Sequence, residues 1–121
     1  MLRRHPIPIL VAVRAVGIAV PAAIPWVGEC LSSRDPHVRR AVVEALGRLS
    51  HPTASAYVRN ALEDSDASVR QVAVMVLSGL GTRGLARSFA ELARTDPSER
   101  VRRAADAALR RGRDQTQGAE P

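Results

Sequence analysis

The sequence is poor in the residues that build catalytic, metal and disulfide sites. It has one cysteine, Cys30, which excludes an internal disulfide and a cysteine-based zinc cluster. Its three histidines, His5, His37 and His51, lack the i, i+4 spacing that would bring two imidazoles to one metal ion. It also has no glycine-rich phosphate loop, no G-x-S-x-G turn and no recognisable cysteine–histidine pair. We therefore expect no enzyme, no cofactor and no metal.

Aromatic residues and lysine are scarce as well. Aromatics make up 2% of the 121 residues, and all 18 basic residues are arginine. The hydrophobic 45% is mainly Ala, Val and Leu, which suits one domain of closely packed helices better than strands. The net charge of +6 lies at the two ends of the chain, because residues 15–99 hold nine arginines and nine acidic residues.

A repeat of 31 or 32 residues runs through the chain. Three segments align, DPHVRRAVVEALGRL from Asp35, DASVRQVAVMVLSGL from Asp66 and SERVRRAADAALRRG from Ser98. Their apolar residues recur at i, i+3, i+4, i+7 and i+8, which is one face of an α-helix. The chain's three aromatics occupy one slot in the helical segment before each copy: Trp26, Tyr57 and Phe89. The repeat therefore predicts an all-α fold, a short α-α superhelix of about three helical hairpins.

Several residues predict where the helices begin and end. Asp35 and Asp96, each followed by proline, are expected to be N-cap residues with proline at the first helical position. Gly81 and Gly112 are expected to end helices. The predicted organisation is a leading helix at 1–20, repeats at 21–49, 52–80 and 82–112, and a disordered polar tail at 113–121.

The pattern D-x-x-V-R-x-x-A-…-A-L-G-x-L resembles the HEAT-like repeat of the phycobilin-lyase type over about residues 20–112. The third copy departs from it, with Ser98 in the Asp slot and Gly112 in the last Leu slot, as a terminal capping repeat does. The resemblance implies a solenoid that serves as a protein–protein interaction module or adaptor. The deoxyhypusine hydroxylases, which have similar repeats, bind iron through His-Glu dipeptides. No histidine here precedes Glu and nothing marks a bilin site, so neither activity is carried over.

Residues 8–18 match the second helix of a repeat and predict an incomplete leading repeat. Slots that hold arginine in later copies are apolar here, so this helix is apolar nearly all round and needs a cover. A partner protein, a second copy of the chain, a membrane or a secretory signal would each fit. Arg14 and the surrounding prolines count against a membrane span. We expect a cytoplasmic protein that docks or forms a homo-oligomer through Ile7, Ile9, Leu10, Val13 and Ile18.

One arginine recurs directly after a core valine in every copy, as Arg39, Arg70 and Arg102. We expect these arginines to form a structural ladder with aspartates of successive turns, which would explain the repetition without a ligand. The predicted aspartates are Asp35, Asp66 and Asp96.

The second helix of each hairpin lines the concave, partner-binding surface in the solenoids that this chain resembles. Val43, Val74 and Met75 are predicted to form an outward apolar strip with a polar border, which is the anatomy of an interface. Isolated apolar surface residues also occur without function. The predicted partner-binding residues are Arg40, Val43, Glu44, Gln71, Val74, Met75, Arg103 and Asp106.

Nucleic acid is the alternative partner, because six arginines lie between Arg100 and Arg113 and could contact phosphates. The neutral body of the chain and the absence of a spare aromatic to stack on bases argue against it.

Overall fold

The computed structural model describes residues 24–49, 51–81 and 84–118, and these form helices without a strand. The predicted all-α fold is therefore confirmed. The elements are α2 (Ile24–Glu29), η2 (Cys30–Ser32), α3 (Pro36–Gly47), α4 (Pro52–Asn60), η3 (Ala61–Glu63), α5 (Ala67–Leu80), α6 (Ala86–Thr95) and α7 (Glu99–Gly118).

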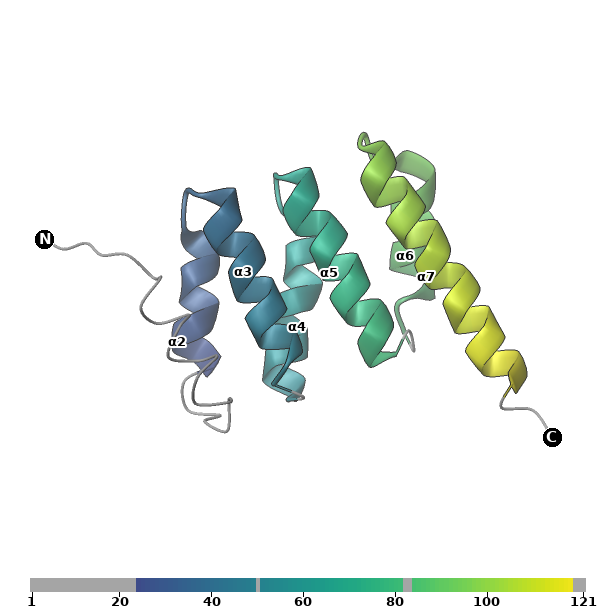
Figure 1. Ribbon diagram of the computed structural model, residues 1–121, viewed down its shortest axis with the longest axis horizontal. Helices are drawn as coiled ribbons and strands as arrows, with labels where there is room; N and C mark the ends of the chain where they lie inside the picture. The colour runs from purple at the N-terminus through teal and green to yellow at the C-terminus, as the bar shows by residue number, and fades with distance from the viewer. Residues whose placement is uncertain (1–23, 50, 82–83, 119–121) are drawn as a thin grey trace, which may run out of the picture.

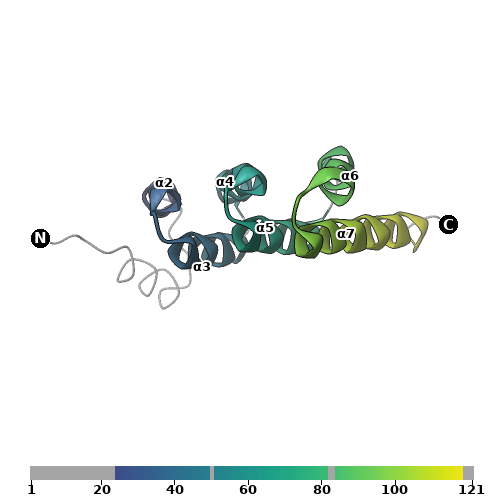
Figure 2. The same cartoon turned by 90° about the horizontal axis from the view of Figure 1, so that it is seen from above.

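The helices form two rows, which Figure 1 shows from the front and Figure 2 from above. The first helices of the hairpins, called here the A helices, are α2, α4 and α6. The second helices, the B helices α3, α5 and α7, form the other row, where α3 packs on α5 and α5 packs on α7. The predicted solenoid of three hairpins is thus present in the described part of the chain.

The residues at the helix ends explain most of the boundaries. The Asp35 carboxylate accepts the His37 amide hydrogen at 2.9 Å, and Pro36 is the first residue of α3, as predicted. Asp66 caps α5 in the same way by accepting from Ser68 and Val69. Gly81 ends α5, as predicted, with a φ of 111° that side chains other than glycine rarely adopt.

Two predictions about the last helix were wrong. Asp96 does not cap α7, which begins at Glu99. Instead, Asp96 ends α6, and its carboxylate accepts the Ser98 amide hydrogen at 2.9 Å. The helix also continues through Gly112 to Gly118, so residues 113–118 are not a disordered tail. An internal glycine costs about 1 kcal/mol relative to alanine, but the residues after Gly112 include Arg113 and Gln115, which are good helix formers. The predicted leading helix at 1–20 lies outside the described residues.

One continuous core lies between the two rows and runs from Val27 to Ala108. Two of the three aromatics in the shared slot contribute to it, since Phe89 is fully buried and Tyr57 packs half-buried against the cluster. The remaining contacts come mainly from the small aliphatic residues that the repeat placed on one helical face. The core residues of the B helices include Val38, Val42, Leu46, Val69, Ala73, Leu77, Val101 and Ala105.

Each B helix also packs against the next along residues spaced four apart, called here the forward line. On α3 this line is Arg39, Val43 and Gly47, and it contacts α5. Gly47 allows the close approach, because a Cβ atom there would lie 2.7 Å from Val76 Cγ1. The equivalent residues of α5 are Arg70, Val74 and Ser78.

The forward line of α7 is charged, with Arg102, Asp106 and Arg110 in the equivalent slots. Asp106 and Arg110 form an ion pair on the exposed surface of the helix. The slots that hold valine and a small residue on α3 and α5 are thus charged on α7.

We predict opposite effects for the same substitution at two helical glycines. Gly47→Ala should lower the free energy of unfolding by about 1 kcal/mol, because the new methyl group meets a valine whose rotamer is fixed in a helix. Gly79→Ala should raise it by about 0.5–1 kcal/mol, because no atom lies within 4 Å of the new methyl group and alanine favours a helix. Urea denaturation measures both values. Equal effects at the two sites would contradict close packing at Gly47.

Candidate interaction surface

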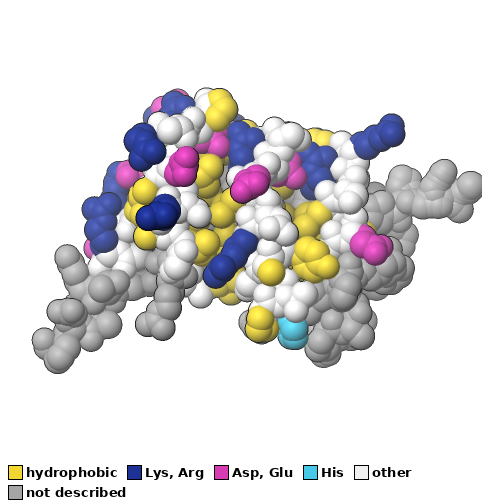
Figure 3. Space-filling view, turned by 180° about the vertical axis from the view of Figure 1, so that it is seen from behind, with side chains coloured by type: hydrophobic (Ala, Val, Ile, Leu, Met, Phe, Trp, Pro, Cys, Tyr) yellow, Lys and Arg dark blue, Asp and Glu magenta, His cyan; other side chains and the backbone are white. Residues whose placement is uncertain are grey.

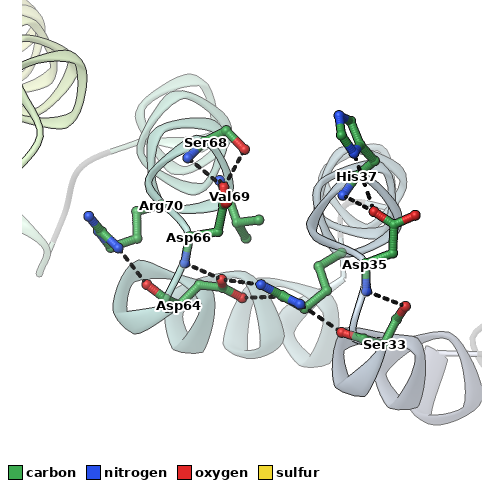
Figure 4. A network of polar contacts seen from close by, with 9 residues as sticks. Ser33, Asp35, His37, Asp64, Asp66, Ser68, Val69 and Arg70 are labelled. Carbon is green, nitrogen blue, oxygen red and sulfur yellow. Dashed lines mark hydrogen bonds and ion pairs between the residues drawn. The ribbon is translucent and has the colours of Figure 1, made fainter.

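Arginine side chains link the turns of successive hairpins. Arg39 donates from Nε and Nη2 to the two carboxylate oxygens of Asp64 at 2.9 and 3.0 Å, and from Nη1 to the Ser33 carbonyl at 2.7 Å. Arg70 repeats this arrangement with Asp96 at 2.8 and 3.0 Å and with the Asp64 carbonyl at 2.7 Å. Figure 4 shows the first of these contacts and the neighbouring caps. Each arginine therefore holds its own turn and the turn of the next hairpin in a bidentate geometry.

The aspartates of this ladder differ in part from the predicted ones. Asp35 and Asp66 are N-cap residues, and Arg39 binds Asp64 instead of Asp66. Asp64 was missed, although Ser33, Asp64 and Asp96 share one slot at the repeat spacing. Arg102 donates to the Asp96 carbonyl of its own turn at 2.7 Å.

The paired side chains of the ladder are largely shielded from water. Only 6% of Asp96 is exposed. Burial alone raises the pKa of Asp96, but hydrogen bonds from Arg70 and the Ser98 amide, together with the charges of Arg70 and Arg102, lower it overall. Hydrogen bonding to Asp64 raises the pKa of Arg39. Asp96 therefore stays ionised at neutral pH, where it can pair with Arg70.

The B helices present a second line of residues to solvent, called here the outer face, on the side seen in Figure 1. Its residues are exposed or half-exposed and again lie four apart. Met75 at the centre is 57% exposed, while the other large apolar side chains of the described residues, apart from Leu80, are buried or half-buried. The outer face consists of Arg40, Glu44 and Arg48 on α3, Gln71, Met75 and Gly79 on α5, and Arg103, Ala107 and Arg111 on α7.

Two shallow grooves meet at Met75. The α3–α5 groove has a volume of about 470 Å³ and is lined by Glu44, Arg48 and Leu80 among others. The α5–α7 groove has about 520 Å³, and Met75 forms part of both walls. Leu80, which is 46% exposed, extends the apolar surface in the first groove.

The outer face overlaps only partly with the predicted partner-binding residues. Val43 and Val74 are 0% exposed, so the prediction that they form an outward strip was wrong. They lie on the forward lines, where a neighbouring B helix covers them. Asp106 occupies the equivalent position on α7, so it belongs to the forward line and not to the outer face. The predicted residues that do lie on the outer face are Arg40, Glu44, Gln71, Met75 and Arg103.

Sequence reasoning missed the last residue of each outer line: Arg48, Gly79 and Arg111. These follow Glu44, Met75 and Ala107 by one helical turn, so extending the predicted lines by four residues would have found them. The predicted end-docking residues Ile7, Ile9, Leu10, Val13 and Ile18 lie outside the described residues.

The described residues can also be compared with the requirements of a metal site, a reactive thiol and a membrane span. No group of three potential metal ligands occurs among them. Burial, and secondarily the charge of Glu29, raises the pKa of the Cys30 thiol, which disfavours the reactive thiolate. None of the helices in the described ranges combines the length and hydrophobicity that crossing a bilayer requires.

Helical hairpins stacked in register, with one row of helices lining an exposed face, define the α-solenoid repeat proteins. The family model for HEAT repeats matches residues 5–78 and 24–110, which together cover most of the chain. The chain belongs to the HEAT repeat family. No curated protein and no solved structure matches it.

We predict that the ladder contributes far more stability than an exposed ion pair. Asp96→Ala should lower the free energy of unfolding by about 3 kcal/mol, because it leaves the shielded Arg70 guanidinium unpaired. Asp106→Ala, which removes an exposed pair with Arg110, should cost under about 1 kcal/mol. Denaturant titration compares the two variants, and a similar cost for both would count against the ladder.

The ladder should also make stability depend on pH. The pKa of Asp96 is lower in the folded chain than in the unfolded chain, so its contribution is present above the unfolded value of about 3.9 and is lost as pH falls through the folded value. The difference in unfolding free energy between the wild type and Asp96→Asn should therefore shrink between pH 6 and pH 2.5. A difference that stayed constant over this range would show that Asp96 has the same pKa in both states.

Proposed function

We propose that this chain is a non-catalytic interaction module that binds a partner protein through the outer face of α3, α5 and α7. The observation that carries the proposal is the exposure of Met75 at the junction of two grooves. Among the described residues, Met75 is the most exposed large apolar side chain, and charged residues of α3 and α7 line the grooves on either side of it. An apolar centre with a polar rim is the usual anatomy of an interface.

The shape of the surface favours a helical or extended segment as the ligand. The grooves run between parallel B helices, and an amphipathic segment can lay its apolar side chains into such a groove. Methionine suits this role, because its unbranched side chain adapts to different partners. The ladder keeps the B helices in place, so the face is formed before a partner arrives.

The opposite face of the molecule is a weaker candidate. Figure 3 shows that the A-helix side carries charges of both signs around the apolar atoms visible between its helices. In the described part of the chain, the two exposed large hydrophobic residues, Met75 and Leu80, belong to α5.

Three finer interpretations also belong to this proposal. The match to HEAT repeats begins at residue 5, which supports a leading half-repeat that could dock a partner or a second copy through its apolar residues. The resemblance to the phycobilin-lyase type of repeat and a cytoplasmic location stay predictions.

Phosphate contacts by nucleic acid are the second candidate, because Arg100, Arg103 and Arg111 lie together on α7. Met75 would have no role in such binding, since a phosphate backbone offers it no apolar contact. Peptide and duplex DNA can therefore be compared directly on the same variants.

Substituting Met75 by Asp should weaken partner binding while leaving the fold intact. Helical peptides would be selected from a displayed random library on the wild-type chain, and their affinities measured by fluorescence anisotropy. We expect Met75→Asp to weaken binding at least about tenfold, as a central interface residue does. Ala56→Asp on α4 places the same charge on the other row and should leave the affinity unchanged.

Both substitutions are at exposed helical positions and should change the free energy of unfolding by less than about 1 kcal/mol. Wild-type affinity in Met75→Asp, or a failure to select any peptide, would rule out the outer face as a protein-binding site. Duplex DNA that bound more tightly than every peptide and was insensitive to Met75→Asp would favour the second candidate.

A further inference from the structure

The two grooves that meet at Met75 differ in charge. The α3–α5 groove contains one acidic and one basic side chain, Glu44 and Arg48. The α5–α7 groove contains Arg100, Arg103 and Arg111, and no acidic residue lines it. A ligand in the second groove therefore meets positive charge on the α7 side and an apolar floor.

Most of this positive charge is uncompensated. Arg103 pairs with Glu99 at 2.7 Å, but both side chains are largely exposed, at 79% and 64%, so water screens the pair and a ligand can replace it. Arg100 and Arg111 make no contact with an acidic side chain among the described residues. Two guanidinium groups on the same groove are thus available to a carboxylate.

The groove also contains a polar atom without a partner. Ser78 is 3% exposed and lines the groove, and its Oγ atom has no hydrogen-bond partner among the described residues. The packing of α5 on α7 requires only a small side chain here, and alanine would satisfy it without burying an unpaired hydroxyl.

We propose that the α5–α7 groove binds an acidic segment of a partner protein. Its carboxylates contact Arg100 and Arg111, a polar atom pairs with the Ser78 hydroxyl, and an apolar side chain packs on Met75. This inference rests on the proposed function and names the chemistry of the partner. The lining residues Met75, Ala104 and Ala107 favour a peptide over a phosphate backbone, because they offer contacts only to apolar groups.

The test uses three displayed libraries of helical peptides that share their apolar positions. The polar positions carry Asp and Glu in the acidic library, Lys and Arg in the basic library, and Ser and Gln in the neutral library. Selection on the full wild-type chain should enrich binders from the acidic library. The double variant Arg100→Glu/Arg111→Glu should then weaken these binders at least tenfold.

A matched control changes the net charge by the same amount elsewhere. Arg87 and Arg94 are exposed on α6, in the other row of helices, and Arg87→Glu/Arg94→Glu should leave the affinity unchanged. The chain has only two methionines, so a ¹³C-methyl label reports on Met75 with a single further signal from Met1. Binding in the groove should shift the Met75 signal.

Ser78→Ala separates a ligand contact from a packing role. It removes the unpaired hydroxyl, so it should raise the urea midpoint of the free chain and at the same time weaken the acidic peptides several-fold. A variant that gained stability and bound the peptides as tightly as the wild type would exclude the hydroxyl from the site.

The outcomes also separate this inference from the function on which it rests. Neutral or basic binders that depend on Met75 would overturn the acidic partner and leave the protein-binding function standing. Acidic binders unaffected by Arg100→Glu/Arg111→Glu would overturn the groove assignment. Peptides whose affinity is unchanged by Met75→Asp would overturn both the acidic-segment inference and the protein-binding function. Binding of a 20-base-pair duplex DNA more tightly than any peptide would do the same.

Discussion

The bidentate contact between an arginine of one hairpin and an aspartate of the next is the constraint on which this solenoid depends. Apolar packing between small aliphatic side chains has little directional preference, so by itself it would tolerate sliding of one hairpin on another. The contacts from Arg39 to Asp64 and from Arg70 to Asp96 remove that freedom, because a planar guanidinium binds a carboxylate in one orientation. The third nitrogen of each arginine holds its own turn.

In the described residues, the ladder joins the turns before α3, α5 and α7. Ile9 occupies the slot of Arg39 in the leading segment, and Ser33 occupies the slot of Asp64 in the next turn. The sequence therefore lacks both members of the pair between the leading segment and the first hairpin. At the last repeat, Arg102 keeps the contact to its own turn, but Asp106 and Arg110 make the forward line of α7 charged. The forward line of α7 thus differs in charge from those of α3 and α5.

The consequence of this register is a preformed outer face. The forward lines bury Val43 and Val74 between B helices, and the adjacent line one position further along the helix is left for solvent. Met75 falls at its centre and the arginines of α7 on one side. The same packing that stabilises the array therefore determines which side chains a partner meets.

The repeat period made most of the fold predictable. Helical spacing within each copy and the shared slot of Tyr57 and Phe89 are local patterns that recur, so the hairpins and the core followed from them. The burial of Val43 could not be predicted in this way, because the neighbouring helix α5 covers this residue and the apolar pattern of one helix does not show where its neighbour packs. The choice of Asp64 over Asp66 likewise depends on how far an arginine reaches across two turns. The extent of α7 was underestimated because Gly112 resembles a C-terminal glycine in sequence and is an internal helical residue in the structure.

A double-mutant cycle on Arg70 and Asp96 tests the central claim most directly. The free energy of unfolding is measured for Arg70→Ala, Asp96→Ala and the double variant. If the ladder fixes the register, the sum of the losses in the two single variants should exceed the loss in the double variant by more than about 1 kcal/mol. The reason is that, once one partner is gone, the second substitution removes a contact that is already broken. Losses that add within about 0.5 kcal/mol would show that the two residues do not act together and would contradict the account.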